Sequence, residues 1–216
     1  MRSLFSEHKG FWTERHKHSL YLAILLVVLS LVIQIGVGKY SEKQALSANS
    51  VGDIFLDNLP VVNLDFMIGT VAFLFWAFCV IFMVLRPRYL LFGLKASALF
   101  IIFRSFFMSL THIGVYPNDT SIDPGGTIGG FLGIFTFPGN YFFSGHTGFP
   151  FLMMLLFWKE KLWRRFFCAA TVLFAATMLL AHAHYSIDVF AAPFITYGIF
   201  KIAGNLFPND RALRDV

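Results

Sequence analysis

The chain has 216 residues, of which 57% are hydrophobic and only 13% are charged, and its mean hydropathy is +0.68. Soluble domains contain about 45–50% apolar residues, so this composition excludes an ordinary soluble protein and indicates a multi-pass membrane protein. The formal net charge is +5. Contact between basic loops and anionic lipid headgroups accounts for this charge, so no nucleic-acid partner is expected.

Six apolar stretches predict an all-α bundle of six transmembrane helices. A helix that crosses the hydrocarbon needs about 20 apolar residues, and the fourth stretch reaches that length only if residues 142–146 extend it. The first follows a polar lead and lacks an A-x-A cleavage site, so we interpret it as an anchor and not as a signal peptide. In chain order the stretches are 20–37, 61–85, 96–115, 147–158, 162–181 and 187–206.

The basic residues predict the orientation. With a cytosolic N-terminus, 14 of the 17 Lys and Arg residues fall in cytosolic segments, Lys39 and Lys43 fall outside, and Arg104 lies within a span. Positive residues accumulate in cytosolic loops, and removing one helix would reverse half of the loops. The pattern therefore favours six spans with both termini in the cytosol. The predicted domains are a basic cytosolic N-terminal segment 1–19, a six-helix transmembrane domain 20–206 and a cytosolic tail 207–216.

The motif SGHT lies where the fourth stretch enters the membrane from the outer face. Ser144 and Gly145 precede an apolar run, which places them at a helix N-terminus whose unpaired N–H groups can bind an anion. Gly145 lets the anion approach the backbone, and Ser144 and Thr147 add hydroxyl groups. His146 adds a proton donor. The motif therefore predicts phosphate binding, with a simple capped helix and an interfacial histidine as the alternative.

The segment HAHYSID brings a second histidine to the same face. His184 and Asp188 are four residues apart, so on a helix they can hydrogen-bond. A carboxylate on one ring nitrogen fixes the tautomer and leaves the other nitrogen as a nucleophile or base. With His146 as a separate proton carrier, the set suffices for double displacement at phosphorus. The alternative is an interfacial His–Asp pair that satisfies its own polarity.

A zinc site is a further alternative for these histidines. His182 is two residues from His184, and in an extended segment both could bind one metal together with His146 and Asp188. No H-E-x-x-H spacing or additional ligand cluster supports this reading. We therefore expect neither a metal nor another cofactor.

Two motifs of this chain, FFSGHT and LLAHAHYSIDVFAAPFIT, resemble the third and fourth signature motifs of the sphingomyelin synthase family, a branch of the type 2 phosphatidic acid phosphatase (lipid phosphate phosphatase) superfamily. The stretches GDIFLDNLP (52–60) and FRSFFMSLTHIGVYP (103–117) resemble two further family motifs more weakly. The resemblance implies a catalytic triad of His146, His184 and Asp188. His184 would attack phosphorus and form a phosphohistidine, Asp188 would orient it, and His146 would exchange protons with the lipid oxygen.

The chain also departs from the lipid phosphate phosphatases, whose K-x6-R-P and S-R-x5-H-x3-D motifs hold phosphate with several cations. Cys79 stands at the Lys position before Arg86, and Met178 stands at the Arg position before His184. A phosphodiester is a monoanion, whereas a phosphomonoester is close to a dianion at neutral pH. A reduced set of cations therefore favours a diester headgroup as the substrate.

Other polar residues have less certain roles. Arg104 is predicted to contact the phosphate, although it could instead pair with a buried acid or with helix carbonyls. The acidic, aromatic outer loop 116–143 has no Lys or Arg and could hold a choline or ethanolamine group. The residues interpreted as either headgroup contacts or structural residues are Asp53, Asp57, Tyr141, Tyr185 and His182.

Together with these observations, the resemblance implies transfer of a phosphocholine or phosphoethanolamine group from a glycerophospholipid to a lipid hydroxyl such as that of ceramide. The partners are thus a donor and an acceptor lipid. The active site would face the extracytoplasmic side of a bacterial inner membrane or of a eukaryotic endomembrane or plasma membrane. With water as the acceptor, the same residues would act as a lipid phosphatase or a phospholipase C. The lesser alternatives are a zinc-dependent membrane hydrolase and a non-catalytic lipid-binding or transport protein.

Overall fold

The computed structural model describes residues 8–117 and 142–214, and within them the chain is all-helical with no strand, which confirms the predicted class. A π-helical turn, η1, leads directly into α3, and together they form one span, Met67–Val84. The elements in chain order are α2 (Glu14–Ala45), η1 (Met67–Val71), α3 (Ala72–Val84), α4 (Pro87–Leu110), α6 (Gly145–Leu156), α7 (Lys161–Leu180), α8 (Ser186–Leu206) and α9 (Pro208–Leu213).

Five helical segments of the described residues are long and apolar enough to cross a membrane, judged by length and composition. They are α2, the η1–α3 span, α4, α7 and α8, and they match five of the six predicted stretches. The sixth stretch corresponds to α6, which is apolar but has only 12 residues. Six full spans and cytosolic termini therefore remain predictions, while a bundle of apolar helices typical of an integral membrane protein is shown.

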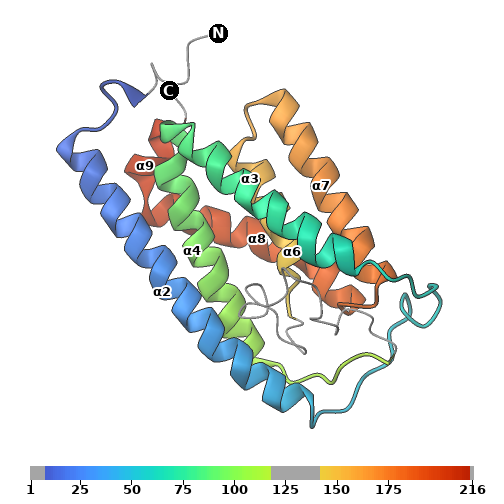
Figure 1. Ribbon diagram of the computed structural model, residues 1–216. Coiled ribbons are helices and arrows are strands. Elements are labelled where there is room, and N and C mark those ends of the chain that lie inside the picture. The colour runs from blue at the N-terminus through green and yellow to red at the C-terminus, as the bar shows by residue number, and fades with distance from the viewer. Residues whose placement is uncertain (1–7, 118–141, 215–216) are drawn as a thin grey trace.

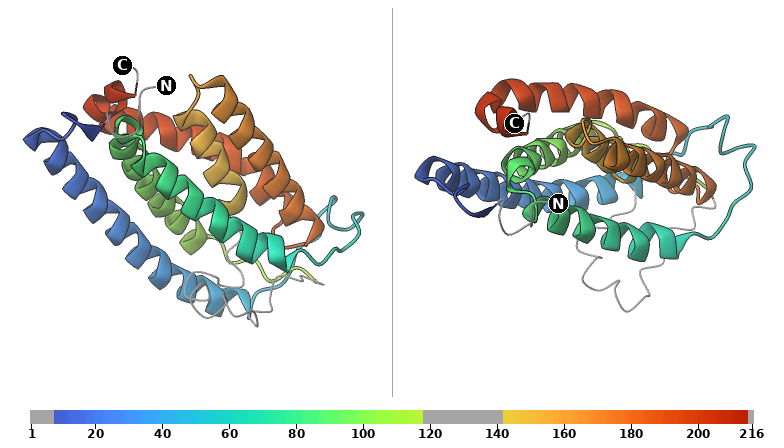
Figure 2. Two further views of the ribbon diagram at one scale, coloured as in Figure 1. Left: turned by 45° about the horizontal axis from the view of Figure 1, so that its top comes forward. Right: turned by 90° about the horizontal axis from the view of Figure 1, so that it is seen from above.

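The helices run back and forth along the bundle, so that the described ends of the chain lie close together at one end (Figures 1 and 2). Residues 46–66, 111–117 and 142–144 and the turn between α7 and α8 lie at the other end. Helix α2 packs mainly against α4, and α6 packs against α4, α7 and α8. The two histidine motifs, about 40 residues apart in sequence, are thereby brought to the same end of the molecule.

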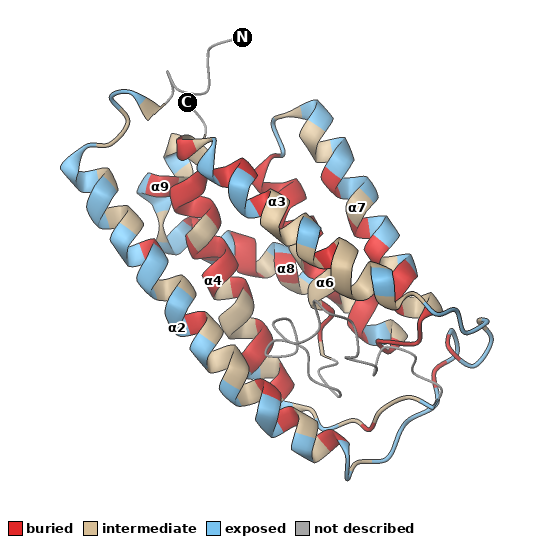
Figure 3. Cartoon of the chain, viewed as in Figure 1, coloured by how far each residue is buried: buried red, intermediate tan, exposed pale blue. Residues whose placement is uncertain are grey.

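The core lies among α4, α6 and α8, whose inner faces are buried, whereas α2 is largely exposed along its length (Figure 3). Phenylalanines dominate this core, and Phe92, Phe143, Phe157 and Phe167 are fully buried. Aromatic side chains bury large areas and pack in tilted or edge-to-face pairs. The outward apolar face of α2 is suited to contact with lipid chains, as expected for a helix at the rim of a membrane bundle.

Several helix boundaries differ from the predicted spans. Helix α4 begins at Pro87 and ends at Leu110, whereas the apolar stretch covers 96–115. Proline is favoured at the first position of a helix, and Lys95 is tolerated inside α4 because its ammonium group pairs with Asp210 at 2.5 Å. Helix α2 extends beyond 20–37 in both directions, and the Thr13 side chain caps its start by accepting from the backbone N–H of His16. Hydropathy thus located the apolar part of each helix and not its ends.

The secondary structure of two further segments differs from what hydropathy alone predicts. Residues 61–64 precede the first helical residues of the η1–α3 segment and are not helical, although three of the four are apolar. Instead, Val62 donates a backbone hydrogen bond to Leu180 at the end of α7, at 2.8 Å. Within the predicted tail, Pro208–Leu213 form helix α9, which packs against α4.

Candidate active site

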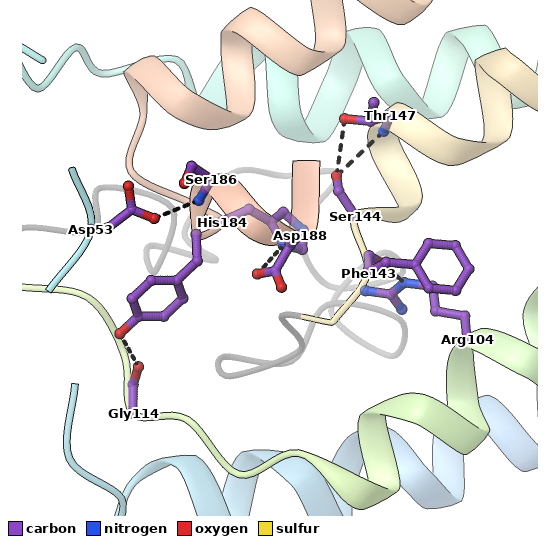
Figure 4. Close-up of polar contacts among 10 residues, drawn as sticks. Asp53, Arg104, Gly114, Phe143, Ser144, Thr147, His184, Ser186 and Asp188 are labelled. Carbon is purple, nitrogen blue, oxygen red and sulfur yellow. Dashed lines mark hydrogen bonds and ion pairs between the residues drawn. The ribbon is translucent and has the colours of Figure 1, made fainter. Parts of the chain in front are cut away.

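The N-terminus of α6 is closed by Ser144, as the SGHT motif predicts (Figure 4). The Ser144 hydroxyl accepts hydrogen bonds from the backbone N–H and the hydroxyl of Thr147, each at 3.3 Å. The Ser144 N–H donates to the backbone carbonyl of Asp188 at 3.1 Å, which ties the start of α6 to α8. The backbone N–H groups of Gly145 and His146 donate to no acceptor among the described residues. These two donors at a helix N-terminus can bind an anion.

Arg104 places a buried cation beside these donors. Its Nε donates to the backbone carbonyl of Phe143 at 2.9 Å (Figure 4). A Cβ atom on Gly145 would lie 3.2 Å from the same Nε, so the absence of a side chain lets the guanidinium group pack against the first turn of α6. The cation also interacts electrostatically with Asp188. Arg104 and the start of α6 thus form one positively polarised corner, suited to an oxyanion.

His184 and Asp188 face each other across the start of α8. Nδ1 of His184 lies 3.5 Å from Oδ2 of Asp188, and both residues are buried. The contact does not have hydrogen-bond geometry, but catalytic contacts are often long or poorly aligned without substrate. Asp188 sits in the first turn of α8, where the helix dipole favours a carboxylate. Nδ1 of His184 therefore faces Asp188, and Nε2 is the ring nitrogen that Asp188 does not contact.

His146 is held through Nε2, whereas His184 is held through Nδ1. Its Nε2 lies 3.2 Å from the backbone carbonyl of Ile68 in the π-helical turn η1. Because a carbonyl only accepts, Nε2 carries the hydrogen and Nδ1 is the other available nitrogen. The ring lies 5.4 Å from that of Trp76 and 6.2 Å from that of Phe174. His146 also interacts electrostatically with His184 and Arg104. Since Arg104 interacts with Asp188 as well, these four ionisable groups form one cluster.

Asp53, from a distant part of the chain, hydrogen-bonds to the start of α8 (Figure 4). Its Oδ2 accepts from the backbone N–H of Ser186 at 2.6 Å, and its Oδ1 accepts from Phe55 and Leu56. Burial alone would raise the pKa of Asp53, but these hydrogen bonds outweigh it and hold the pKa below the usual 3.8. Asp53 therefore supports the segment that carries His184, which agrees with the structural reading of this residue.

Tyr185 and Asp57 link the other connecting segments at this end. The Tyr185 hydroxyl donates to the carbonyl of Gly114 at 2.9 Å and accepts from the N–H of Val51 at 3.3 Å. The Tyr116 hydroxyl donates to Asp57 at 2.5 Å, which raises the pKa of Tyr116 to about 12. Residues 46–66, 111–117 and the start of α8 are thereby joined into one hydrogen-bonded layer. Both Tyr185 and Asp57 have structural contacts here.

Replacing Asp53 with Asn is expected to lower the free energy of unfolding by about 1.5–3 kcal/mol at pH 7, because the charged acceptor of three N–H groups is lost. A carboxyl whose pKa is depressed in the folded state stabilises the protein above its unfolded pKa and loses that effect as the pH falls through the folded value. The difference between Asp53→Asn and the wild type should therefore shrink below pH 3.8. Thermal unfolding in detergent at pH 7 and at lower pH measures it. A difference that does not change with pH would argue against the carboxylate as its source.

His182 occupies a different place from the predicted triad. It follows α7 with a φ of 55°, in the left-handed region that glycine usually fills. Ala183 donates to Met178 and His182 donates to Leu179, which is the Schellman pattern that closes a helix. The His182 ring is buried edge-on against Tyr116, 5.3 Å between centroids. Within residues 8–117 and 142–214, no group of three His, Cys, Asp or Glu side chains is arranged to hold a metal, so the zinc alternative gains no ligand set.

Several predicted or motif-matched residues do not join the cluster. Arg86 lies at the far end of α3, where it pairs with Glu160 at 2.5 Å and lies 4.5 Å above the ring of Phe82. Cys79 and Met178 are buried in apolar clusters. Tyr141 lies outside the described residues, as does most of the loop 116–143.

Two contacts that position the site were not predicted from the sequence. They are the contact of His146 with the Ile68 carbonyl and the hydrogen bond from Arg104 to the Phe143 carbonyl. Backbone carbonyls occur at every residue, so they carry no sequence signal. The phenylalanine before SGHT and the apolar run after Asp65 gave no reason to single them out.

Residues 139–205 match the family described as PAP2 superfamily C-terminal. Over this stretch, the chain is similar to the PAP2 superfamily. The match covers about a third of the chain and contains His146, His184 and Asp188. It supports the superfamily predicted from the motifs and, with the apolar helices, indicates an integral membrane enzyme of the lipid phosphatase or phosphotransferase type. Comparisons with curated proteins and with solved structures give no match.

Proposed function

We propose that the protein is a membrane phosphotransferase that moves a phospho-headgroup from a glycerophospholipid to a lipid hydroxyl such as that of ceramide. The observation that carries this proposal is the cluster at one end of the bundle. There, the His184–Asp188 pair lies beside His146, Arg104 and the start of α6. It unites an oriented nucleophile, a proton carrier and an anion site, which are the parts that double displacement at phosphorus requires.

In the first step, the donor phosphate binds at the N–H groups of Gly145 and His146 and at the guanidinium group of Arg104. Nε2 of His184 attacks phosphorus, because Asp188 holds Nδ1 and orients the ring. The bond between phosphorus and the diacylglycerol oxygen breaks as the P–N bond forms. His146 enters this step as an imidazolium with hydrogens on both ring nitrogens and gives its Nδ1 proton to the departing oxygen, because Ile68 engages Nε2. The products are diacylglycerol and a phosphohistidine that carries the headgroup.

In the second step, the acceptor hydroxyl takes the place of diacylglycerol. His146 now removes the hydroxyl proton, the acceptor oxygen attacks phosphorus, and the P–N bond to His184 breaks. His146 and His184 return to their starting states. If water is the acceptor, the same sequence gives hydrolysis, so a phospholipase C or lipid phosphatase is the second candidate function.

The preference for a phosphodiester rests on the small number of cations near the site. Arg104 is the one Lys or Arg side chain that the described residues place in the cluster. Cys79 and Met178, at the positions of family cations, are apolar and buried, and Arg86 is engaged by Glu160 at the other end. One guanidinium group and two helix N–H groups match a monoanion better than a dianion. A choline or ethanolamine ester is therefore the proposed donor headgroup, and the site is proposed to face the extracytoplasmic side.

The proposal is tested by incubating purified protein in mixed micelles with fluorescent ceramide and one glycerophospholipid donor at a time. Products are identified by mass spectrometry, with reactions that lack ceramide or protein as controls. The expected result is a phospho-headgroup ceramide and an equal amount of diacylglycerol. Free phospho-headgroup formed at the same rate with and without ceramide would favour the hydrolase. Rapid phosphatidate hydrolysis without any diester turnover would contradict the diester preference.

A further inference from the structure

A cavity of about 420 Å³ lies at the end of the bundle opposite the histidine cluster. It is formed by the first turns of α2, by α4, by the end of α8 and by α9, next to the described ends of the chain (Figure 1). Its volume lies within the range of small-molecule sites. The polar residues that line it are Arg15, His16, His18, Ser19, Lys95, Asn209 and Asp210.

One buried ion pair forms the inner wall of this cavity. The Lys95 ammonium group, only 3% exposed, lies 2.5 Å from Asp210 and donates to the hydroxyl of Ser19 at 2.8 Å. Ser19 in turn donates to Asp210 at 2.8 Å. These contacts hold α2, α4 and α9 together, and the charges of Lys95 and Asp210 cancel. The inner wall is therefore neutral.

The remaining charge on the cavity wall is positive. Arg15 forms no ion pair among the described residues, whereas its neighbour Lys17 pairs with Glu14 at 2.7 Å. His16 and His18 both direct Nδ1 to backbone carbonyls, of Phe11 and Glu14 respectively. Since carbonyls only accept, each ring is fixed with Nδ1 as the donor. Among the described residues that line the cavity, Arg15 is thus the one uncompensated cation and no acid is uncompensated, which favours an anionic ligand.

The opposite part of the cavity is apolar. Leu22, Leu206 and Leu213 line it, and Leu22 and Leu206 are exposed at the surface of the bundle. The outward face of α2 beside the cavity carries exposed Tyr21 and Leu25. A cavity that joins a basic wall to an apolar wall at the end of a membrane bundle matches a lipid, with a charged head and apolar chains.

We propose that this cavity binds the phosphate of an anionic phospholipid headgroup, at a site separate from the histidine cluster, with Arg15 as the main contact. The two sites lie at opposite ends of the bundle, so this lipid is not the reacting one. Arg15 contacts the phosphate, and the Lys95–Asp210 pair keeps the wall of the cavity in place.

The test compares Arg15→Gln with Lys17→Gln in the full-length chain, purified in a neutral detergent. Both residues are exposed cations of α2, but only Arg15 lines the cavity. Binding of short-chain phosphatidylglycerol, phosphatidylcholine and inorganic phosphate is measured by native mass spectrometry and by the shift in thermal unfolding. The wild type and Lys17→Gln should bind phosphatidylglycerol alike. Arg15→Gln should bind it about tenfold more weakly, as expected for the loss of a charge-assisted hydrogen bond.

The same experiment separates this site from the active site and from other sources of phosphate. Arg104→Gln should keep the Arg15-dependent binding of phosphatidylglycerol, whatever its effect on lipid turnover. Equal losses in Arg15→Gln and Lys17→Gln would overturn the proposal, because they would indicate only a general surface charge effect. An Arg15-dependent shift with inorganic phosphate as large as that with phosphatidylglycerol would overturn the assignment to a lipid.

Discussion

His184→Ala is expected to abolish headgroup transfer, with a loss of about 10⁴-fold or more in kcat, as for other enzymes that lose their nucleophile. The side chain is buried, with Nδ1 facing Asp188, so in the proposed mechanism no neighbouring group can replace Nε2 as the attacking atom. The substitution removes the attacking atom but leaves Asp53 and Ser144 in contact with the backbone of α8. The variant should therefore fold and bind the donor lipid.

The control for His184→Ala is His112→Ala. His112 lies among the residues at the same end of the bundle, but it is exposed and its ring packs edge-on against Tyr40. Rapid quenching followed by mass spectrometry of peptides should detect a phosphorylated His184 in the wild type and in His112→Ala, but not in His184→Ala. Substantial turnover by His184→Ala would refute its role as nucleophile.

His146→Ala is expected to slow transfer by about 10²–10⁴-fold, the usual contribution of a general acid or base. The two proposed steps should respond differently to the choice of donor. With a natural glycerophospholipid, the leaving oxygen needs a proton, so the first step is slow. With a p-nitrophenyl ester of phosphocholine, the leaving group departs as an anion, and the first step no longer depends on His146.

The p-nitrophenyl donor should therefore produce a burst of p-nitrophenol in His146→Ala, after which the phosphohistidine persists because the acceptor hydroxyl cannot be deprotonated. Stopped-flow absorbance measures the burst, and peptide mass spectrometry measures the intermediate. His182→Ala serves as the matched control, since its ring packs against Tyr116 outside the cluster. Equal slowing with both donors would argue that His146 positions the phosphate instead of transferring the proton.

The sequence was sufficient to predict which segments meet at the end of the bundle that carries the candidate site. Long apolar stretches must be helices in a bilayer because their backbone groups have no water to bond. Once the helices alternate in direction, the motifs at 144–147 and 182–188 must lie at one end. The spacing of His184 and Asp188 predicts a contact if both residues lie on one helix. The structure places the two groups 3.5 Å apart, but His184 precedes the first residue of α8, so the contact forms across the start of the helix and not along a helical turn. The residue types and their positions near the helix ends carried this information.

Other contacts depend on packing that no local pattern encodes. Asp53 reaches the N–H of Ser186 across more than 130 residues, and Lys95 pairs with Asp210 from the end of the chain. Their positions depend on how the loops fold and on how α9 turns back, which follow from many weak contacts and not from one motif. The sequence identified Asp53 as a motif match, but only the structure shows what it binds. Lys95 was counted as a loop cation and is instead part of a buried wall.

The short length of α6 determines where the proposed chemistry takes place. Its 12 residues span about 18 Å, against about 30 Å for the hydrocarbon layer. Arg104, which touches its first turn, lies about 9 Å before the end of α4 along the helix axis. The phosphate would therefore be held below the ends of the surrounding helices. A lipid could reach that depth by moving sideways through the bilayer, so under the proposed function the depth of the site would favour alcoholysis over hydrolysis.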